Sequence, residues 1–137
     1  MSKSNLRYAT LAWSRDLVFE GGAPGGPTII VDGNSEVGPS PVVSLLIAAA
    51  SCTGADVVLI LDKMRAGLTE FRIAARGTRR EEDPRRYLAM HFTYHLRGTD
   101  LDETRARRAI DLSIQKYCSV MHSLAPDIAV TYDLELG

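Results

Sequence analysis

One stretch of the chain decides the fold, because it combines a helix start with a long apolar run. Residues 38–62 read GPSPVVSLLIAAASCTGADVVLILD. Ser40 is a good N-cap, and Pro41 fits the first helical position because its missing N–H would have no helical partner. From there to Leu61 the residues are apolar on nearly every side, and the interruptions are Ser44, Ser51, Cys52, Thr53, Gly54 and Asp56. The pattern predicts a long helix that is buried all round.

Two interpretations fit so apolar a helix. A membrane span needs about 20 apolar residues, which this stretch could supply. Asp56 argues against a span, because a carboxylate well inside a bilayer costs about 2.5–3.5 kcal/mol. We therefore favour a helix covered by protein. A chain of 137 residues offers too little surface to cover it alone, so we infer a partner subunit.

Strand patterns precede the helix. Three short apolar segments, 6–13, 17–19 and 28–31, are separated by turns, the second of them rich in glycine. They predict three antiparallel strands. A polar loop, 32–36, then leads to the helix start.

Two more strands are predicted after the long helix, which Gly67 would close. Segments 71–76 and 88–97 alternate apolar and polar residues, as strands with one buried face do. The charges of 79–86 are of mixed sign and predict a solvated hairpin connection without a function.

A second helix and a last strand complete the order. Asp100 or Asp102 would cap the helix, and 128–136 alternates without interruption, as a strand does. One face of the helix is suited to packing and carries Ala106, Ala109, Ile110, Ser113 and Tyr117. The order β-β-β-α-β-β-α-β predicts the α+β class.

Length and charge narrow the class of protein further. The 137 residues are 45% apolar, which suits one core and predicts a single domain, 1–137. Sixteen basic and seventeen acidic residues leave a net charge of −1, so nothing calls for nucleic acid or an anionic membrane as partner. The polar N-terminus lacks the pattern of a signal peptide, and we expect a cytoplasmic protein.

Two cysteines are the residues best suited to chemistry. In a reducing cytoplasm they are seldom a structural staple, and they lack the CxxC spacing of zinc or thioredoxin motifs. Cys52 lies among alanines in the long helix, where an inert core cysteine is the more common outcome. Cys118 lies near the end of the second helix, and Lys116 points elsewhere on that helix. Redox chemistry requires the two thiols to meet in space.

Two motifs at a fixed spacing carry a family resemblance. The first is Gly38-Pro39-Ser40-Pro41 leading into Ser51-Cys52-Thr53-Gly54-Ala55-Asp56-Val57-Val58 and closing with Lys63-Met64-Arg65. The second is Tyr117-Cys118-Ser119-Val120. Together with Asp32-Gly33-Asn34, they resemble the OsmC/Ohr family, most closely its OsmC-like, YhfA-type branch. The resemblance extends from about Trp13 to Leu136.

The resemblance implies an OsmC-like fold and a redox activity. The fold would be an intertwined homodimer with two long buried helices per chain, sheets built from both chains, and active sites at the interface. Cys52 would be the peroxidatic thiolate that attacks an organic or lipid-like hydroperoxide, and Cys118 the resolving thiol that condenses with the sulfenic acid. No bound cofactor or metal is implied. An external dithiol, such as a lipoylated reductant protein, would restore both thiols.

The family's supporting arginine and glutamate are only partly matched. In active members an arginine favours the thiolate and a glutamate holds the arginine. Arg15 matches the arginine by position, although a charged turn between two strands explains it equally well. Val42 and Val43 occupy the place of the glutamate, so Asp16 or Glu36 would have to replace it from a loop.

Other polar residues carry weaker hypotheses. His122 follows Cys118 by one helical turn and could serve it as base or proton donor. His91 and His95 share a strand face about 13 Å apart, too far for one metal ion, which favours a structural role. Asp56 follows Cys52 by one turn, and we expect it to make a structural hydrogen bond because a carboxylate beside a thiol raises the thiol's pKa.

The sequence is therefore compatible with three candidate functions. The first is a dimeric, thiol-dependent hydroperoxide reductase of oxidative stress defence, and retention of both cysteines favours it. The second is a non-catalytic dimer that binds a small hydrophobic ligand or senses redox state, which the valines at 42 and 43 favour. A purely structural protein would fit the composition but gives no reason for two buried thiols.

Overall fold

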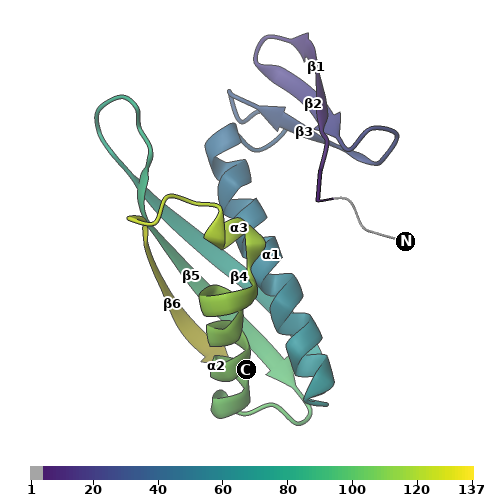
Figure 1. The fold of residues 1–137 in the computed structure, drawn as a ribbon, viewed down its shortest axis with the longest axis vertical. Coiled ribbons are helices and arrows are strands. Elements are labelled where there is room, and N and C mark those ends of the chain that lie inside the picture. The colour runs from purple at the N-terminus through teal and green to yellow at the C-terminus, as the bar shows by residue number, and fades with distance from the viewer. Residues whose placement is uncertain (1–4) are drawn as a thin grey trace. The chain divides into compact units, whose positions relative to one another are not determined.

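The computed structural model describes residues 5–137 (Figure 1). The chain divides into two compact units, one that ends at Leu45 and one from Leu46 to Gly137. The helix α1 (Pro41–Lys63) begins in the first unit and continues through the second. The expectation of a single domain stays a prediction.

The first unit is a three-stranded antiparallel sheet, as the sequence predicts. Its strands β1 (Thr10–Arg15), β2 (Val18–Gly22) and β3 (Thr28–Asp32) pair in the order β1-β2-β3. The first strand was expected over 6–13 but begins at Thr10. The reason is that Thr10 pairs with Gly22, the last residue of β2, so the residues before Thr10 have no strand opposite them.

The helix α1 begins where its capping signals predict. Ser40 Oγ accepts a hydrogen bond from the Val43 N–H at 3.3 Å, and Pro41 is the first helical residue. The helix ends at Lys63. Arg65 (φ 56°) and Gly67 (φ 66°) are both left-handed, which turns the chain back toward the next strand.

The chain itself buries one stripe of α1. The buried side of the helix consists of Ala49, Thr53, Gly54, Val57 and Leu61. By length and composition α1 could also cross a membrane, but core helices of soluble proteins pass the same test, and 22% of its apolar window is buried within the chain. That a second chain covers the rest stays a prediction.

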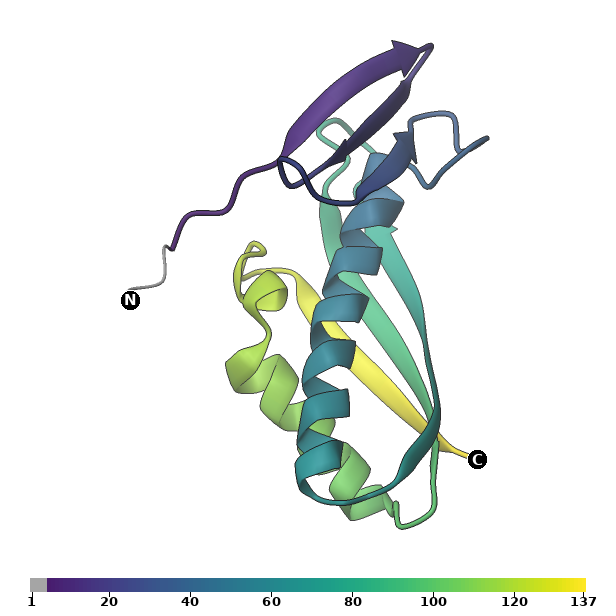
Figure 2. The same cartoon turned by 90° about the vertical axis from the view of Figure 1, so that its right-hand side faces the viewer.

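The second unit pairs its sheet with helices on one face, as Figures 1 and 2 show. Strand β4 (Leu68–Arg79) runs antiparallel to β5 (Tyr87–Gly98), and β6 (Ala129–Leu136) runs parallel to β5. The predicted one-sided burial of β5 is confirmed from Met90 to Leu96, whereas Leu88, which the alternation also assigns to the buried face, is 42% exposed. Its fully or almost fully buried residues are Met90, Phe92, Tyr94 and Leu96.

The second helix is not continuous, contrary to expectation. It consists of α2 (Glu103–Leu112), the π-helical segment η1 (Ser113–Tyr117) and α3 (Ser119–His122). Asp102 is the N-cap and accepts from the Arg105 N–H at 2.8 Å. The Cys118 N–H donates to the Ser113 carbonyl at 2.8 Å, one residue further along than in an α-helix.

This extra residue corrects the predicted packing face. An α-helix would bring Tyr117 round to the side of Ser113, and the sequence analysis placed it there. Tyr117 is instead 52% exposed, whereas Cys118 is fully buried. The π-helical segment turns Tyr117 outward and puts Cys118 on the packed face.

Candidate active site

The two cysteines lie in contact within the second unit. Cys52 is on α1, and Cys118 lies between η1 and α3. Both are free thiols, and Cys52 lies close enough to Cys118 to raise the pKa of the Cys118 thiol. The structure thus brings together the two residues that the sequence singled out for chemistry.

The two thiols differ in their access to solvent. Cys52 is half-buried, whereas Cys118 is fully buried. Burial raises the pKa of Cys118 to about 11, and the contact with Cys52 and the Asp56 carboxylate raise it as well. The Met121 N–H, which donates to the Cys118 sulfur at 3.4 Å, opposes this rise. At neutral pH Cys118 is therefore a protonated thiol.

A buried polar network lies beside the thiols. The Ser113 hydroxyl is 2.8 Å from Asp56 Oδ2 and 3.0 Å from Thr53 Oγ1. The Thr53 hydroxyl is in turn 3.0 Å from the hydroxyl of Tyr94. Thr53, Ser113 and Tyr94 are fully buried, and burial raises the pKa of Tyr94 to about 12. The network joins α1, η1 and β5 at the level of the thiols.

Asp56 makes the structural hydrogen bond that the sequence analysis expected. Its partner is the hydroxyl of Ser113 rather than a basic side chain or a backbone group. Thr53, Ser113 and Tyr94 were not recognised as members of a network. The available signal was two polar residues in otherwise apolar stripes, Thr53 on α1 and Ser113 at the start of η1, because buried hydroxyls need partners.

His122 does not point its ring at the thiol. Its Nδ1 lies 2.8 Å from the Cys118 carbonyl oxygen, and its Nε2 lies 3.2 Å from the Gln115 carbonyl oxygen. The turn from Cys118 to His122 is helical, because the His122 N–H donates to the Cys118 carbonyl at 3.1 Å, but the ring contacts backbone carbonyls and a role as base or proton donor stays a prediction. In this structure His122 holds the backbone around Cys118.

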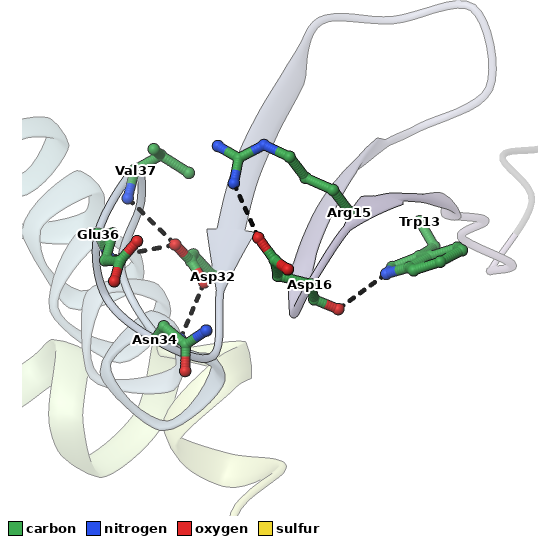
Figure 3. Close-up of polar contacts among 7 residues, drawn as sticks. All are labelled: Trp13, Arg15, Asp16, Asp32, Asn34, Glu36 and Val37. Carbon is green, nitrogen blue, oxygen red and sulfur yellow. Dashed lines mark hydrogen bonds and ion pairs between the residues drawn. The ribbon is translucent and has the colours of Figure 1, made fainter.

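Arg15 belongs to the first unit, where it pairs with its neighbour. Its guanidinium lies 3.1 Å from the Asp16 carboxylate, and the Trp13 indole N–H donates to the Asp16 carbonyl at 2.9 Å (Figure 3). Asp16 is thus one of the two carboxylates that the sequence analysis named as a substitute for the missing glutamate. Val42 and Val43 lie in the first turn of α1.

Asp32 is a structural residue at the end of β3, where the sequence predicts the start of a polar loop. Its side chain is almost fully buried and accepts three backbone N–H bonds, from Asn34 at 2.8 Å and from Glu36 and Val37 at 3.1 Å each (Figure 3). These donors, Asn34 first, hold the pKa of Asp32 below its usual value. Asp-Gly-Asn after a strand was the sequence signal for such a turn.

His91 and His95 lie on the sheet face opposite the helices. His91 contacts Thr131 Oγ1 at 2.7 Å and the Asp133 carboxylate at 3.1 Å. His95 pairs with Glu135 at 2.8 Å. Each histidine has its own carboxylate on β6, and within residues 5–137 no three His, Cys, Asp or Glu side chains are grouped to hold a metal ion. The structural role favoured from the sequence fits this arrangement.

An apolar groove of about 410 Å³ lies between α1 and β4. It is lined by Ile47, Ala50, Ser51, Gly54, Val58, Phe71, Arg72 and Ile73. Neither cysteine is among these residues.

The fold and the pair of thiols define a class of protein. The family model described as OsmC-like protein matches residues 32–133, and the chain belongs to this family. Its fold is the α+β OsmC-like fold, with two main helices.

Individual relatives agree with this assignment. Protein YhfA of Escherichia coli (strain K12) is 36% identical over 129 residues, which are 93% of this chain and 96% of YhfA. The crystal structure of a hypothetical protein from Aquifex aeolicus VF5 is 28% identical with a TM-score of 0.83, covering 98% of this chain and 99% of that one. The organic hydroperoxide resistance protein OhrB of Bacillus subtilis shares the fold at 12% identity and a TM-score of 0.63, covering 95% and 98%.

Proposed function

We propose that the protein is a thiol-dependent hydroperoxide reductase that cycles through a Cys52–Cys118 disulfide. One observation carries the proposal: a half-buried thiol lies beside a fully buried one whose pKa is raised to about 11. A peroxide can reach the first thiol more easily than the second. The second stays protonated and unreactive until a sulfenic acid forms beside it.

The chemistry divides into three steps. The Cys52 thiolate attacks the O–O bond of the hydroperoxide, which leaves Cys52 as a sulfenic acid and releases an alcohol after protonation. The Cys118 thiol then condenses with the sulfenic acid, and water leaves as the disulfide forms. An external dithiol, for which a protein-bound lipoyl group is the candidate, supplies two electrons and two protons to restore both thiols. No bound cofactor is needed.

Arg15 is the candidate for the cation that favours the Cys52 thiolate. Its ion pair with Asp16 supports the idea that this aspartate fulfils the role of the missing glutamate, because it fixes the direction of the guanidinium. His122 would contribute indirectly, by holding the Cys118 carbonyl.

A homodimer is the assembly that we propose. Cross-strand partners share a face, and the register of the first sheet puts Leu11, Trp13, Phe19 and Ile29 on one face. These side chains are 64%, 66%, 37% and 64% exposed in the single chain. Exposed apolar surface of this kind marks an interface, and a second copy in the cytoplasm would cover it together with the open sides of α1.

A second candidate is a non-catalytic dimer that binds a small hydrophobic ligand or senses redox state. The apolar groove beside α1 and the valines at 42 and 43 favour it. In that case the thiols could still form a disulfide, but peroxide would not be turned over.

Consumption of cumene hydroperoxide with a dithiol reductant tests the proposal. We expect turnover by the wild type and none by Cys52→Ser. In Cys118→Ser the first peroxide should leave Cys52 as a sulfenic acid, which a second peroxide oxidises to the sulfinic acid, visible by mass spectrometry as added oxygen. Ser51→Ala, which removes an exposed hydroxyl next to Cys52, is the control and should keep its activity. Turnover no higher than in the double Cys→Ser variant would reject the reductase. A retained apolar ligand in native mass spectrometry would then favour the binding protein.

A further inference from the structure

The polar network is placed to determine where the Cys118 thiol lies. Ser113 is the first residue of η1, and its carbonyl accepts the Cys118 N–H that closes the π-helical turn. The side chain of the same residue is bound to α1 through Asp56 and Thr53. One residue thus links the backbone of the turn to the helix that carries Cys52.

The hydrogen bonds of the network can be donated in one direction only. An ionised carboxylate only accepts, and a hydroxyl has one hydrogen to donate. Ser113 therefore donates to Asp56, Thr53 donates to Ser113, and Tyr94 donates to Thr53. Asp56 is the end of the chain, so it determines the direction of every hydrogen bond in it.

The π-helical turn needs stabilising contacts, because a regular α-helix is the alternative conformation of this segment. A regular α-helix would bring Tyr117 to the packed side and turn Cys118 by about 100° away from it. An isolated π-helical turn is rare, and such turns occur frequently at functional sites. The buried hydrogen bonds of Ser113 stabilise this turn because they fix its first residue against α1.

We propose that Asp56 and Ser113 are positioning residues, which hold the π-helical turn Ser113–Tyr117 and thereby keep the Cys118 thiol against Cys52. The inference rests on the thiol–disulfide cycle proposed above. Asp56 also lies close enough to Cys118 to raise the pKa of that thiol. This is expected, because Asp56 is on the same side of α1 as Cys52.

The test measures the thiol–disulfide equilibrium without any peroxide. The protein is equilibrated with oxidised and reduced dithiothreitol: the two thiols lose two electrons and two protons, which the oxidised dithiothreitol takes up. The ratio of protein disulfide to dithiol reports how well Cys118 is held against Cys52. The wild type should form the disulfide even if it proves unable to reduce peroxides, which separates this inference from the proposed function.

Four variants complete the test. Ser113→Ala and Asp56→Leu, which remove the donor and the acceptor, should each lower the equilibrium constant for disulfide formation by about tenfold or more. Asp56→Asn keeps a carbonyl acceptor and should stay within about threefold of the wild type. Ser123→Ala is the matched control, because it removes a hydroxyl at the C-cap of α3 that donates to the Ser119 carbonyl, and it should have no effect.

Three outcomes would overturn the proposal. The first is that folded Ser113→Ala and Asp56→Leu have the same equilibrium constant as the wild type. The second is that the wild type forms no disulfide. The third is failure of both variants to fold by circular dichroism, because the network would then be needed for the whole fold rather than for one turn. Faster alkylation of Cys118 by iodoacetamide in Ser113→Ala than in Ser123→Ala, in a Cys52→Ser background, would support the expected rotation of the thiol.

Discussion

The two units of the chain use the same strand pattern with opposite results. In the second unit, β5 alternates and its apolar side is buried from Met90 to Leu96, with Phe92 and Tyr94 at 0% exposure. In the first unit, an equally apolar sheet face stays open, with Leu11 and Trp13 at 64% and 66% exposure. Of the residues described there, two are buried, Val18 and Asp32.

The difference lies in the elements that follow each sheet. The second unit contains α2 and most of α1, which supply apolar side chains to one face of its sheet. The first unit contains three strands and the start of α1. A two-layer arrangement is the minimum for a core. The second unit should therefore be stable through its own packing, whereas the first should depend on contacts beyond its own residues.

The largest expected effect is the loss of a core side chain in the second unit. Phe92→Ala should lower the free energy of unfolding by about 3–5 kcal/mol, because it leaves a cavity where a fully buried ring was. Urea denaturation at a fixed protein concentration measures the change. Phe92→Leu, which keeps most of the volume, should cost less than about 1.5 kcal/mol. Equal losses in both variants would mean that the ring is not in a close-packed core.

A smaller effect is expected from a charge on the open face of the first unit. Leu11→Lys should weaken the dimer by about tenfold or more, equivalent to about 1.4 kcal/mol, because a lysine would be buried at the interface. Sedimentation velocity over a dilution series measures the dissociation constant.

The opposite face of the same strand supplies the control for this variant. Ala12 is adjacent to Leu11 and points to the other side of the sheet, where it pairs with Glu20. Ala12→Lys should leave the dimer intact. A monomeric wild type, or equal effects of the two lysines, would contradict the assignment of this face to a second copy.

Much of the fold could be predicted from the sequence because it follows local rules. Ser40 and Pro41 mark the start of α1, and the alternation of 88–97 marks β5 with its buried side. The break in the second helix could not be predicted in this way. A single π-helical turn shifts the periodicity by one residue, and the residues beyond it, Ser119 to His122, are too few to show the shift.

The candidate site could be predicted in part, because its two cysteines belong to sequence motifs. The resemblance singled out Cys52 and Cys118, and the structure brings them together. Ser113 was counted as part of an apolar face, since periodicity describes which side of a helix is packed and not which hydrogen bonds form there. The roles of Arg15 and His122 depend on neighbours that no local pattern encodes.

The smallest expected effect concerns Asp32, the one buried charged residue among residues 5–45. Asp32→Asn should lower the thermal midpoint by less than Phe92→Ala does, because the amide cannot accept all three N–H bonds that the carboxylate holds. The pKa of Asp32 is lowered from 3.8 in the folded state. Its contribution is therefore present above the unfolded pKa and is lost as the pH falls through the lower folded pKa.

The pH dependence distinguishes this carboxylate from an exposed one. The difference in thermal midpoint between the wild type and Asp32→Asn should be constant near neutral pH and should shrink below about pH 4. Asp16→Asn, at an exposed left-handed turn position that asparagine tolerates, should show little difference at any pH. If Asp32→Asn changed the thermal midpoint as little as Asp16→Asn, the three backbone hydrogen bonds would not stabilise the first unit. Contacts with a second chain would then have to stabilise the first unit without them.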